Sequence, residues 1–265
     1  MFARVRAPID YAMYPVSDGK PMAETEVHRI QMNDLIFNCT NLLADEPDVY
    51  VGGNMLMYYH EGYGRDHVSA DVFVTFEVER GIRECWMTWE ENGRFADVVF
   101  EISSPSTIKE DLGKKMRLYA QLGVIEYYLY DPQRNNKPPL AGYRLVDGAY
   151  QPMTRLLGVE GYHSEVLGAD LRVINGRLRV IDPATGEPML VPSELEAVRA
   201  RAEAARQQAE AARKAAEERA EYEASAHQAA EQRAANEADA RRATEAGLRE
   251  ALEEIARLRA AADQG

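Results

Sequence analysis

The 265-residue sequence carries 31 basic and 44 acidic residues, a net charge of −13, so it lacks the broad basic face of proteins that bind nucleic acid tightly. Its two cysteines, Cys39 and Cys85, provide neither a disulfide framework nor metal-ligand spacing, which favours a reducing cytoplasm. No apolar run approaches the ~18 residues needed to cross a bilayer and no signal peptide is visible, so we expect a soluble protein without membrane contact. No P-loop, GxGxxG or CxxC motif points to a nucleotide cofactor or structural zinc.

The first ~20 residues predict an extended arm that ends in a turn. A helix is expected from about Pro21 to Leu43, because apolar residues recur on one side of it at helical spacing. These residues are Val27, Ile30, Leu35, Cys39 and Leu42. Glu24 lies in the first turn, where an acidic residue suits the helix dipole but could also reach a site at the inner edge.

Short strand patterns follow this helix. Residues 49–51 and 55–59 flank a Gly-Gly-Asn sequence and predict a β-hairpin. Residues 68–78 alternate well enough to form one strand, with Asp71 near its start.

Segment 95–132 combines strand, helix and strand in under forty residues. Alternation in its first apolar run places Asp97, Val99 and Glu101 on one face, which should be at least half buried. The two carboxylates lie four strand residues apart, roughly 13 Å at ~3.3 Å per residue, so both cannot bind one ion directly. Asp97 could therefore position water, contact a second ion or cap a neighbouring loop.

The helix of this segment is expected to start at Thr107, with Glu110 completing a capping box, and to end at Gly123. Helical spacing predicts a core-facing stripe of Leu112, Met116, Tyr119 and Leu122. Lys115 leaves the helix on the same side as this stripe. Either its stem follows the stripe to water, or its ammonium enters a pocket that holds the acidic residues of the strand.

Together with the segments that follow, these elements predict one mixed α/β domain over residues 1–192. Residues 140–150 and 178–181 predict an antiparallel extension, with turns at Asp147-Gly148 and Asn175-Gly176. Trp86 and Trp89 are interpreted as packing or edge-strand residues and not as residues that stack on a ligand.

Composition changes abruptly at Pro192. All 12 prolines lie at or before it, whereas residues 193–265 contain 26 alanines and two glycines. We expect a long helix there, capped by Ser193. This tail carries 12 basic and 16 acidic residues, which leaves −9 on the body, so neither part is basic.

The tail also carries apolar positions at alternating three- and four-residue spacing, interrupted in its middle and resumed near its end. The resumed cluster comprises Leu248, Leu252, Ile255 and Leu258. A lone helix would leave it in water, so we expect a coiled coil through residues 193–265 that makes the protein a homo-oligomer, with a dimer as the expected state. The alternative is a solvated single helix.

A resemblance to a known family lies in three runs: DVVFEISSPST (97–107), DLGKK (111–115) and LYAQLGVIEYYLYDP (118–132). They are similar to the signature of the Uma-type putative restriction endonuclease family, a branch of the PD-(D/E)XK nuclease superfamily. Three upstream runs resemble that family in the same order: YPVSDGKPMAETEVH, VYVGGNMLMYYHEG and ADVFVTFEVERG. The resemblance implies a restriction-endonuclease-like mixed sheet flanked by helices.

The resemblance also implies a DNA endonuclease that uses Mg²⁺ or Mn²⁺, held by Asp71 and Glu101. The lysine that follows the glutamate by two residues in that superfamily is here Ser103. An inward Lys115 on the following helix can occupy the same volume. In the superfamily a glutamate of the first helix often reaches the metal, which makes Glu24 a further candidate.

Two functions from different classes stay open. One is a metal-dependent DNA endonuclease, whose DNA binding would be weak unless the tail presents several sites to one duplex. The other is a catalytically degenerate interaction protein assembled through the coiled coil, which Ser103 and the negative charge favour. Three histidines, His28, His60 and His67, have no partner at a diagnostic spacing, and we expect them to be surface or core residues.

Overall fold

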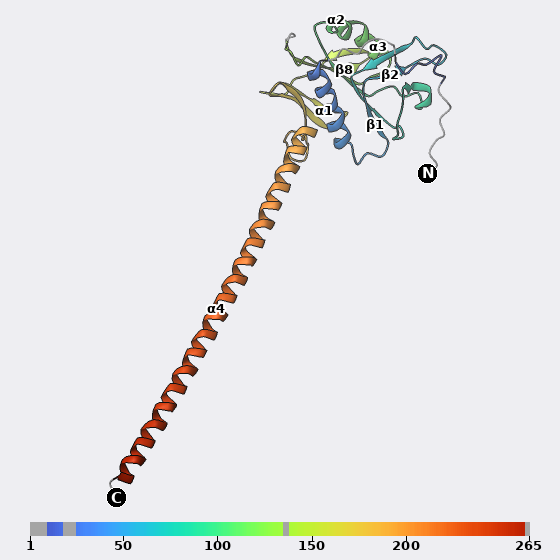
Figure 1. Ribbon diagram of the computed structural model, residues 1–265. Coiled ribbons are helices and arrows are strands. Elements are labelled where there is room, and N and C mark those ends of the chain that lie inside the picture. Colours follow the sequence, from blue (N-terminus) through green and yellow to red (C-terminus); the bar gives the residue numbers. More distant parts are fainter. Residues whose placement is uncertain (1–9, 18–24, 135–137, 263–265) are drawn as a thin grey trace. The chain divides into compact units, whose positions relative to one another are not determined.

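The computed structural model describes residues 10–17, 25–134 and 138–262 (Figure 1). The chain divides into two compact units, Met1–Leu195 and Glu196–Gly265. All strands of the described residues lie in the first unit, and the second consists of most of one helix.

The first unit is built on a six-stranded sheet of order β1-β4-β6-β7-β8-β9. Its strands are β1 (Val49–Gly52), β4 (Val72–Phe76), β6 (Val98–Ile102), β7 (Glu126–Tyr130), β8 (Leu140–Val146) and β9 (Ala149–Pro152). Strands β6 and β7 pair in parallel and all other neighbours are antiparallel. This mixed sheet, with helices beside it and the long helix after it, confirms the predicted α/β class.

Two three-stranded sheets complete the strand content of the described residues. One has the order β3-β2-β5 and consists of β2 (Met55–Tyr58), β3 (His67–Ala70) and β5 (Trp86–Met87). The other has the order β10-β11-β12 and consists of β10 (Gly161–Ser164), β11 (Ala169–Ile174) and β12 (Arg177–Ile181).

The predicted hairpin over residues 49–59 is wrong, because β1 pairs with β4 and β2 pairs with β3 and β5. The expected single strand over 68–78 is likewise divided at Asp71 into β3 and β4, which belong to different sheets. Segments 49–59 and 68–78 each pass from one sheet to the other at the point where they lie side by side. At that crossing the amide of Asn54, a residue with left-handed φ of 51°, donates to Ala70 O (2.9 Å).

The two predicted later turns are confirmed. Asp147-Gly148 joins β8 to β9 and Asn175-Gly176 joins β11 to β12. Both residues of each turn have positive φ, as the favoured two-residue hairpin turn requires.

Helix α1 (Glu26–Leu42) begins after Thr25, whose Oγ1 accepts a hydrogen bond from the amide of His28 (3.3 Å). The predicted start near Pro21, and Glu24 with it, lie outside the described residues. Val27 is exposed, contrary to the predicted stripe, because the buried side consists of Gln31, Met32, Asp34, Leu35, Asn38 and Cys39.

The helix after β6 is divided into α2 (Ile108–Glu110), the π-helical turn η2 (Asp111–Lys115) and α3 (Met116–Gln121). The predicted capping box does not form, because Thr107 already has helical backbone angles and its Oγ1 accepts from the amide of Ser104 (3.0 Å). Leu112 is 45% exposed and does not belong to the core. Gly123, with φ of 80°, follows the helix as expected.

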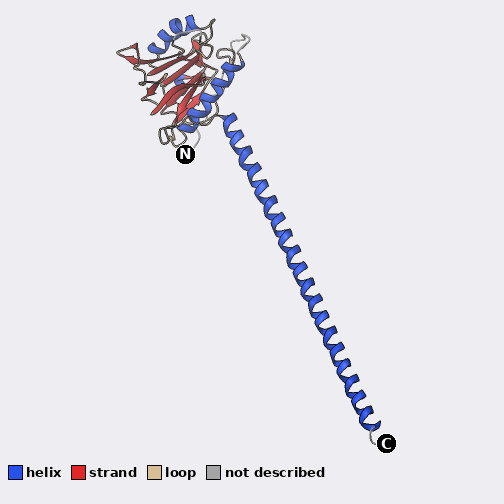
Figure 2. Cartoon of the chain, turned by 90° about the vertical axis from the view of Figure 1, so that its left-hand side faces the viewer, coloured by secondary structure: helices blue, strands red, loops and turns tan. Residues whose placement is uncertain are grey.

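The central strands of this sheet are buried on both faces. Figure 2 shows the strands with helices beside them. On one face, Val98, Phe100 and Ile102 pack with residues of α1 and of the β10–β12 sheet. On the other face, Val99 packs with Phe73, Tyr119 and Tyr127. Because Glu101 follows Val99 by two residues, it leaves the sheet on this second face, as the alternation predicts.

Helix α4 (Pro192–Ala262) begins one residue before the predicted cap. Ser193 lies inside the helix, because Pro192 takes the first helical position, where its missing N–H costs no hydrogen bond. Glu194 Oε2 accepts from the amide of Val191 (3.1 Å) and caps the first turn instead. Within the described residues, no helix is both long and apolar enough to span a membrane.

Candidate functional site

Asp71 and Glu101 face each other across two neighbouring strands. Strands β4 and β6 pair Val72 with Phe100, so the same antiparallel register continued by one residue places Asp71 opposite Glu101. Side chains at opposed positions leave a sheet on the same face, with Cβ atoms ~4.5–5.5 Å apart. Together they line a cavity of about 410 Å³. The other described lining residues are Thr25, His28, Ile102, Ser104, Pro105, Ser106, Thr107, Asp111, Lys115 and Gln133.

The carboxylate of Asp71 is held by two donors from different elements. Its Oδ2 accepts from the amide of Ile102 at the end of β6 (2.6 Å) and lies 3.0 Å from His28 Nε2 of α1. The chain also passes very close behind it, because a Cβ added to Gly53 would lie 2.1 Å from Asp71 O. The crossing of the two sheets thus positions this residue.

Glu101 is only 1% exposed and both of its carboxylate oxygens are bonded. Tyr119 OH donates to Oε1 (2.6 Å), and Lys115 Nζ donates to Oε2 (2.8 Å). The structure therefore brings Lys115, whose side chain is 19% exposed, to the strand carboxylate, while Lys114 is exposed.

A second carboxylate, Asp111, supports this lysine and was missed by the sequence reasoning. It is buried, its Oδ2 accepts from Ser103 Oγ (3.0 Å), and its Oδ1 lies 3.6 Å from Lys115 Nζ. Ser103 thus donates its hydroxyl to the carboxylate that lies beside Lys115. The i,i+4 spacing of Asp111 and Lys115 was the available signal.

Three carboxylates, Asp71, Glu101 and Asp111, surround one ammonium in this cavity. Burial raises the pKa of Glu101 to about 8; Lys115 opposes that rise, and the charges of Asp71 and Asp111 add to it. Burial acts to lower the pKa of Lys115, but the three carboxylates together raise it above its ordinary value. Lys115 is therefore a cation at neutral pH, whereas the raised pKa of Glu101 marks a buried carboxyl that a bound divalent cation would help to ionise.

This charge balance suits a hard divalent cation. Among the described residues, no group of three or more His, Cys, Asp or Glu side chains is arranged to hold a metal, so a closed all-protein cage is not formed. Mg²⁺, however, usually binds one or two carboxylates and completes its shell with water and substrate phosphate oxygens. Asp71 and Glu101 fit that donor set, because each carboxylate oxygen can accept a further contact.

Asp97 is not among the described residues that line the cavity. Its Oδ2 accepts from the amide of Phe76 (2.7 Å), and Arg94 Nη2 donates to its Oδ1 (2.9 Å). Asp97 therefore holds the end of β4 in place. Of the three roles considered for it, which were positioning water, contacting a second ion and capping a loop, the contacts fit the last. Glu24 lies outside the described residues, so its predicted role stays a prediction.

His28 differs from expectation, because it contacts Asp71 and lines the cavity. The other two histidines lie elsewhere. His60 Nδ1 is 2.8 Å from Asp66 Oδ2, and His67 Nδ1 is 3.1 Å from Gly64 O. No spacing rule could have revealed the His28 contact, since its partner is 43 residues away in the sequence.

The Uma2 family model, described as "Putative restriction endonuclease", matches residues 12–173. No curated protein matches the sequence significantly. Among solved structures, the chain is similar to one described as a putative nuclease belonging to DUF820 from Anabaena variabilis ATCC 29413. The two share 14% sequence identity with a TM-score of 0.41, over 56% of this chain and 77% of that chain.

Proposed function

Because the chain belongs to the Uma2 family of putative restriction endonucleases, we propose that it is a metal-dependent endonuclease that hydrolyses phosphodiester bonds of DNA. One observation carries this proposal. Asp71, Glu101 and Lys115 line a single cavity, with the ammonium bonded to the buried carboxylate. This is a site with two hard oxygen ligands and a fixed positive charge.

In the proposed site, Asp71 and Glu101 hold Mg²⁺ or Mn²⁺. When bound, the ion would supply a Lewis acid and a water of lowered pKa. Tyr119 and the amide of Ile102 orient the two carboxylates, which limits the reorganisation needed for reaction. Lys115 keeps a positive charge beside Glu101, where it can stabilise charge developing on the scissile phosphate.

Ser103 and Asp111 position this lysine in the proposal. Asp111 accepts from Ser103 and lies beside Lys115 Nζ, so the ammonium is held from two sides, by Asp111 and by Glu101. The serine in place of the usual lysine is then compatible with activity.

We further propose that the helical tail, residues 193–265, assembles the protein and thereby strengthens DNA binding. Three apolar side chains near its end are exposed in the single chain: Leu248 at 64%, Leu252 at 59% and Ile255 at 47%. Packing them against a second copy would remove this apolar surface from water. Several sites on one duplex would offset the weak attraction of an acidic body for phosphate. The sequence has two cysteines, Cys39 and Cys85, both buried and without metal-ligand spacing, which supports a reducing compartment such as the cytoplasm.

The alternative is a non-catalytic interaction protein. It is favoured by the bonds that already occupy both oxygens of Glu101. Divalent-ion binding separates the two functions, because only the nuclease needs it.

Plasmid cleavage by the full chain, with Mg²⁺ and with Mn²⁺, tests the proposal. Glu101→Gln should abolish cleavage and weaken Mn²⁺ binding, because the variant retains the shape of the side chain but loses its charge. Glu110→Gln, an exposed change in the next helix, is the matched control and should cleave like the wild type. Wild-type protein that binds no divalent ion at millimolar concentration and leaves the plasmid uncut would favour the interaction protein.

A further inference from the structure

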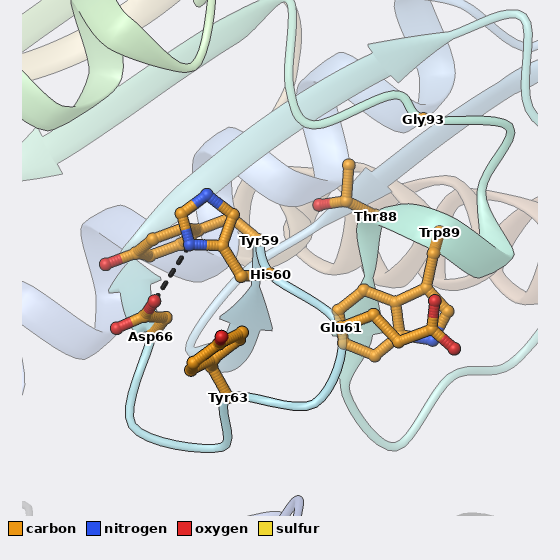
Figure 3. Close-up of a pocket in the computed structure, with 8 residues that line it drawn as sticks. All are labelled: Tyr59, His60, Glu61, Tyr63, Asp66, Thr88, Trp89 and Gly93. Carbon is orange, nitrogen blue, oxygen red and sulfur yellow. Dashed lines mark hydrogen bonds and ion pairs between the residues drawn. The ribbon is translucent and has the colours of Figure 1, made fainter.

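A second cavity, of about 570 Å³, shares no described lining residue with the first. It lies between the loop that joins β2 to β3 and the 3-10 helix η1 (Thr88–Glu90) with the turn after it (Figure 3). Its volume falls within the range of small-ligand pockets, ~300–1,000 Å³.

Aromatic rings form much of the wall of this cavity. Figure 3 shows Tyr59, Tyr63 and Trp89 on different sides of the opening. The ring of His60 lies edge-on to its neighbours, 5.1 Å from Tyr59 and 6.4 Å from Tyr63 between centroids. Tyr63 is 66% exposed, so it presents an aromatic ring to solvent at little cost to the core.

Among the polar groups that line the cavity, which include His60 and Thr88, two are carboxylates. Glu61 and Asp66 contribute two carboxylates, and none of the described lining residues is Lys or Arg. Asp66 Oδ2 contacts His60 Nδ1 at 2.8 Å, as the dashed line in Figure 3 marks. A phosphate-bearing ligand would meet two like charges here, whereas an organic cation would meet opposite charges and aromatic faces.

Both walls are held in place by hydrogen bonds within and between their own segments. The amide of Asp66 donates to Tyr63 O (2.9 Å) within the loop, and the amide of Gly93 donates to Thr88 O (2.9 Å) on the other side. Thr88 Oγ1 donates to Tyr58 O (2.9 Å) and joins the two walls. A ligand would therefore bind without first ordering the site.

We propose that this cavity binds an arginine or lysine side chain of a partner polypeptide. The cationic head group lies against the rings of Tyr63 and Trp89, with Glu61 as its charge partner. The volume exceeds that of one guanidinium or ammonium group, so the stem of the side chain and adjacent peptide also find room. This function is independent of the proposed nuclease site.

Tryptophan fluorescence of the full chain tests this proposal directly. The protein has two tryptophans, and Trp86 is fully buried, so a ligand-induced change reports on Trp89. At low salt, a glycine-flanked arginine peptide should give a saturable change. The same peptide with citrulline, a neutral isostere of arginine, should bind at least about fivefold more weakly, since it lacks the charge.

Variants and competing ligands complete the design. Tyr63→Ala and Glu61→Gln should each weaken peptide binding about threefold or more. Tyr222→Ala and Glu250→Gln, matched exposed changes in the tail, should have no effect. Equal binding of the citrulline peptide, equal losses in the control variants, or tighter binding of a thymidine oligonucleotide would overturn the proposal. Choline binding as tightly as the peptide would also overturn it, in favour of a small organic cation.

Discussion

Gly53→Ala tests whether the crossing of the two sheets positions Asp71, the proposed metal ligand. The added Cβ would lie 2.1 Å from Asp71 O and 3.0 Å from Ile36 Cδ1. An ordinary contact begins at 3.4 Å, so the two backbones must separate by about 1.3 Å. Displacements of ~1 Å at a catalytic group cost on the order of 10²-fold in rate, and we expect that loss in plasmid cleavage.

The same substitution should also destabilise the fold by ~1–3 kcal/mol, so the assay must separate the two effects. Gly161→Ala is the matched control, because its Cβ would lie 2.4 Å from Leu171 O in the β10–β12 sheet, which does not line the cavity. It should lose comparable stability in thermal unfolding but cleave normally per folded molecule. Gly81→Ala, with no atom within 4 Å of the new Cβ, should change neither quantity.

The reasoning fails if Gly53→Ala cleaves plasmid and binds Mn²⁺ like the wild type at equal folded fraction. It also fails if Gly161→Ala loses as much activity, because general destabilisation would then explain both variants.

Three further predictions concern other parts of the chain. Lys115→Ala should slow plasmid cleavage by about 10²-fold or more, whereas Lys114→Ala should leave it nearly unchanged; equal rates would remove Lys115 from the mechanism. Asp97→Ala should lower the free energy of unfolding by ~1–3 kcal/mol in urea, because it leaves the amide of Phe76 unpaired, without changing cleavage per folded molecule. In light scattering, a chain ending at Pro192 should be smaller in oligomeric state than the full chain, and equal states would show that the tail does not assemble the protein.

The strands were predictable where their signal is local. Alternation at Val98–Ile102 correctly separated the two faces of β6, and the Asp-Gly and Asn-Gly turns correctly joined their hairpins. Pairing was not predictable in the same way. The Gly-Gly-Asn sequence at 52–54 has hairpin composition, but it serves a crossing between two sheets, and that depends on residues some twenty positions away.

In the candidate site, too, residues marked by a local sequence pattern were predictable, and residues brought in from distant parts of the chain were not. The sequence identified Asp71, Glu101 and Lys115 through family-like runs, and the structure brings all three to one cavity. His28 reaches that cavity from another helix, which no local pattern predicts. Asp97 satisfied the alternation as well as Glu101 did, but four residues along a strand carry it to a different set of partners.

The π-helical turn explains why Lys115 was correctly placed although Leu112, the first residue of the predicted stripe, was not. The other residues of the stripe pack in the core as predicted: Met116, Tyr119 and Leu122. Spacing of 3.6 residues puts Leu112 and Lys115 on one side, yet Leu112 is exposed and Asp111 is buried in its place. Over η2 the turn is wider, so Asp111 faces Glu101 while Lys115 and Tyr119, four residues apart, both still bond to that carboxylate. Polar groups therefore determine the local winding here, because burying Asp111 and Lys115 requires partners that an apolar stripe cannot offer.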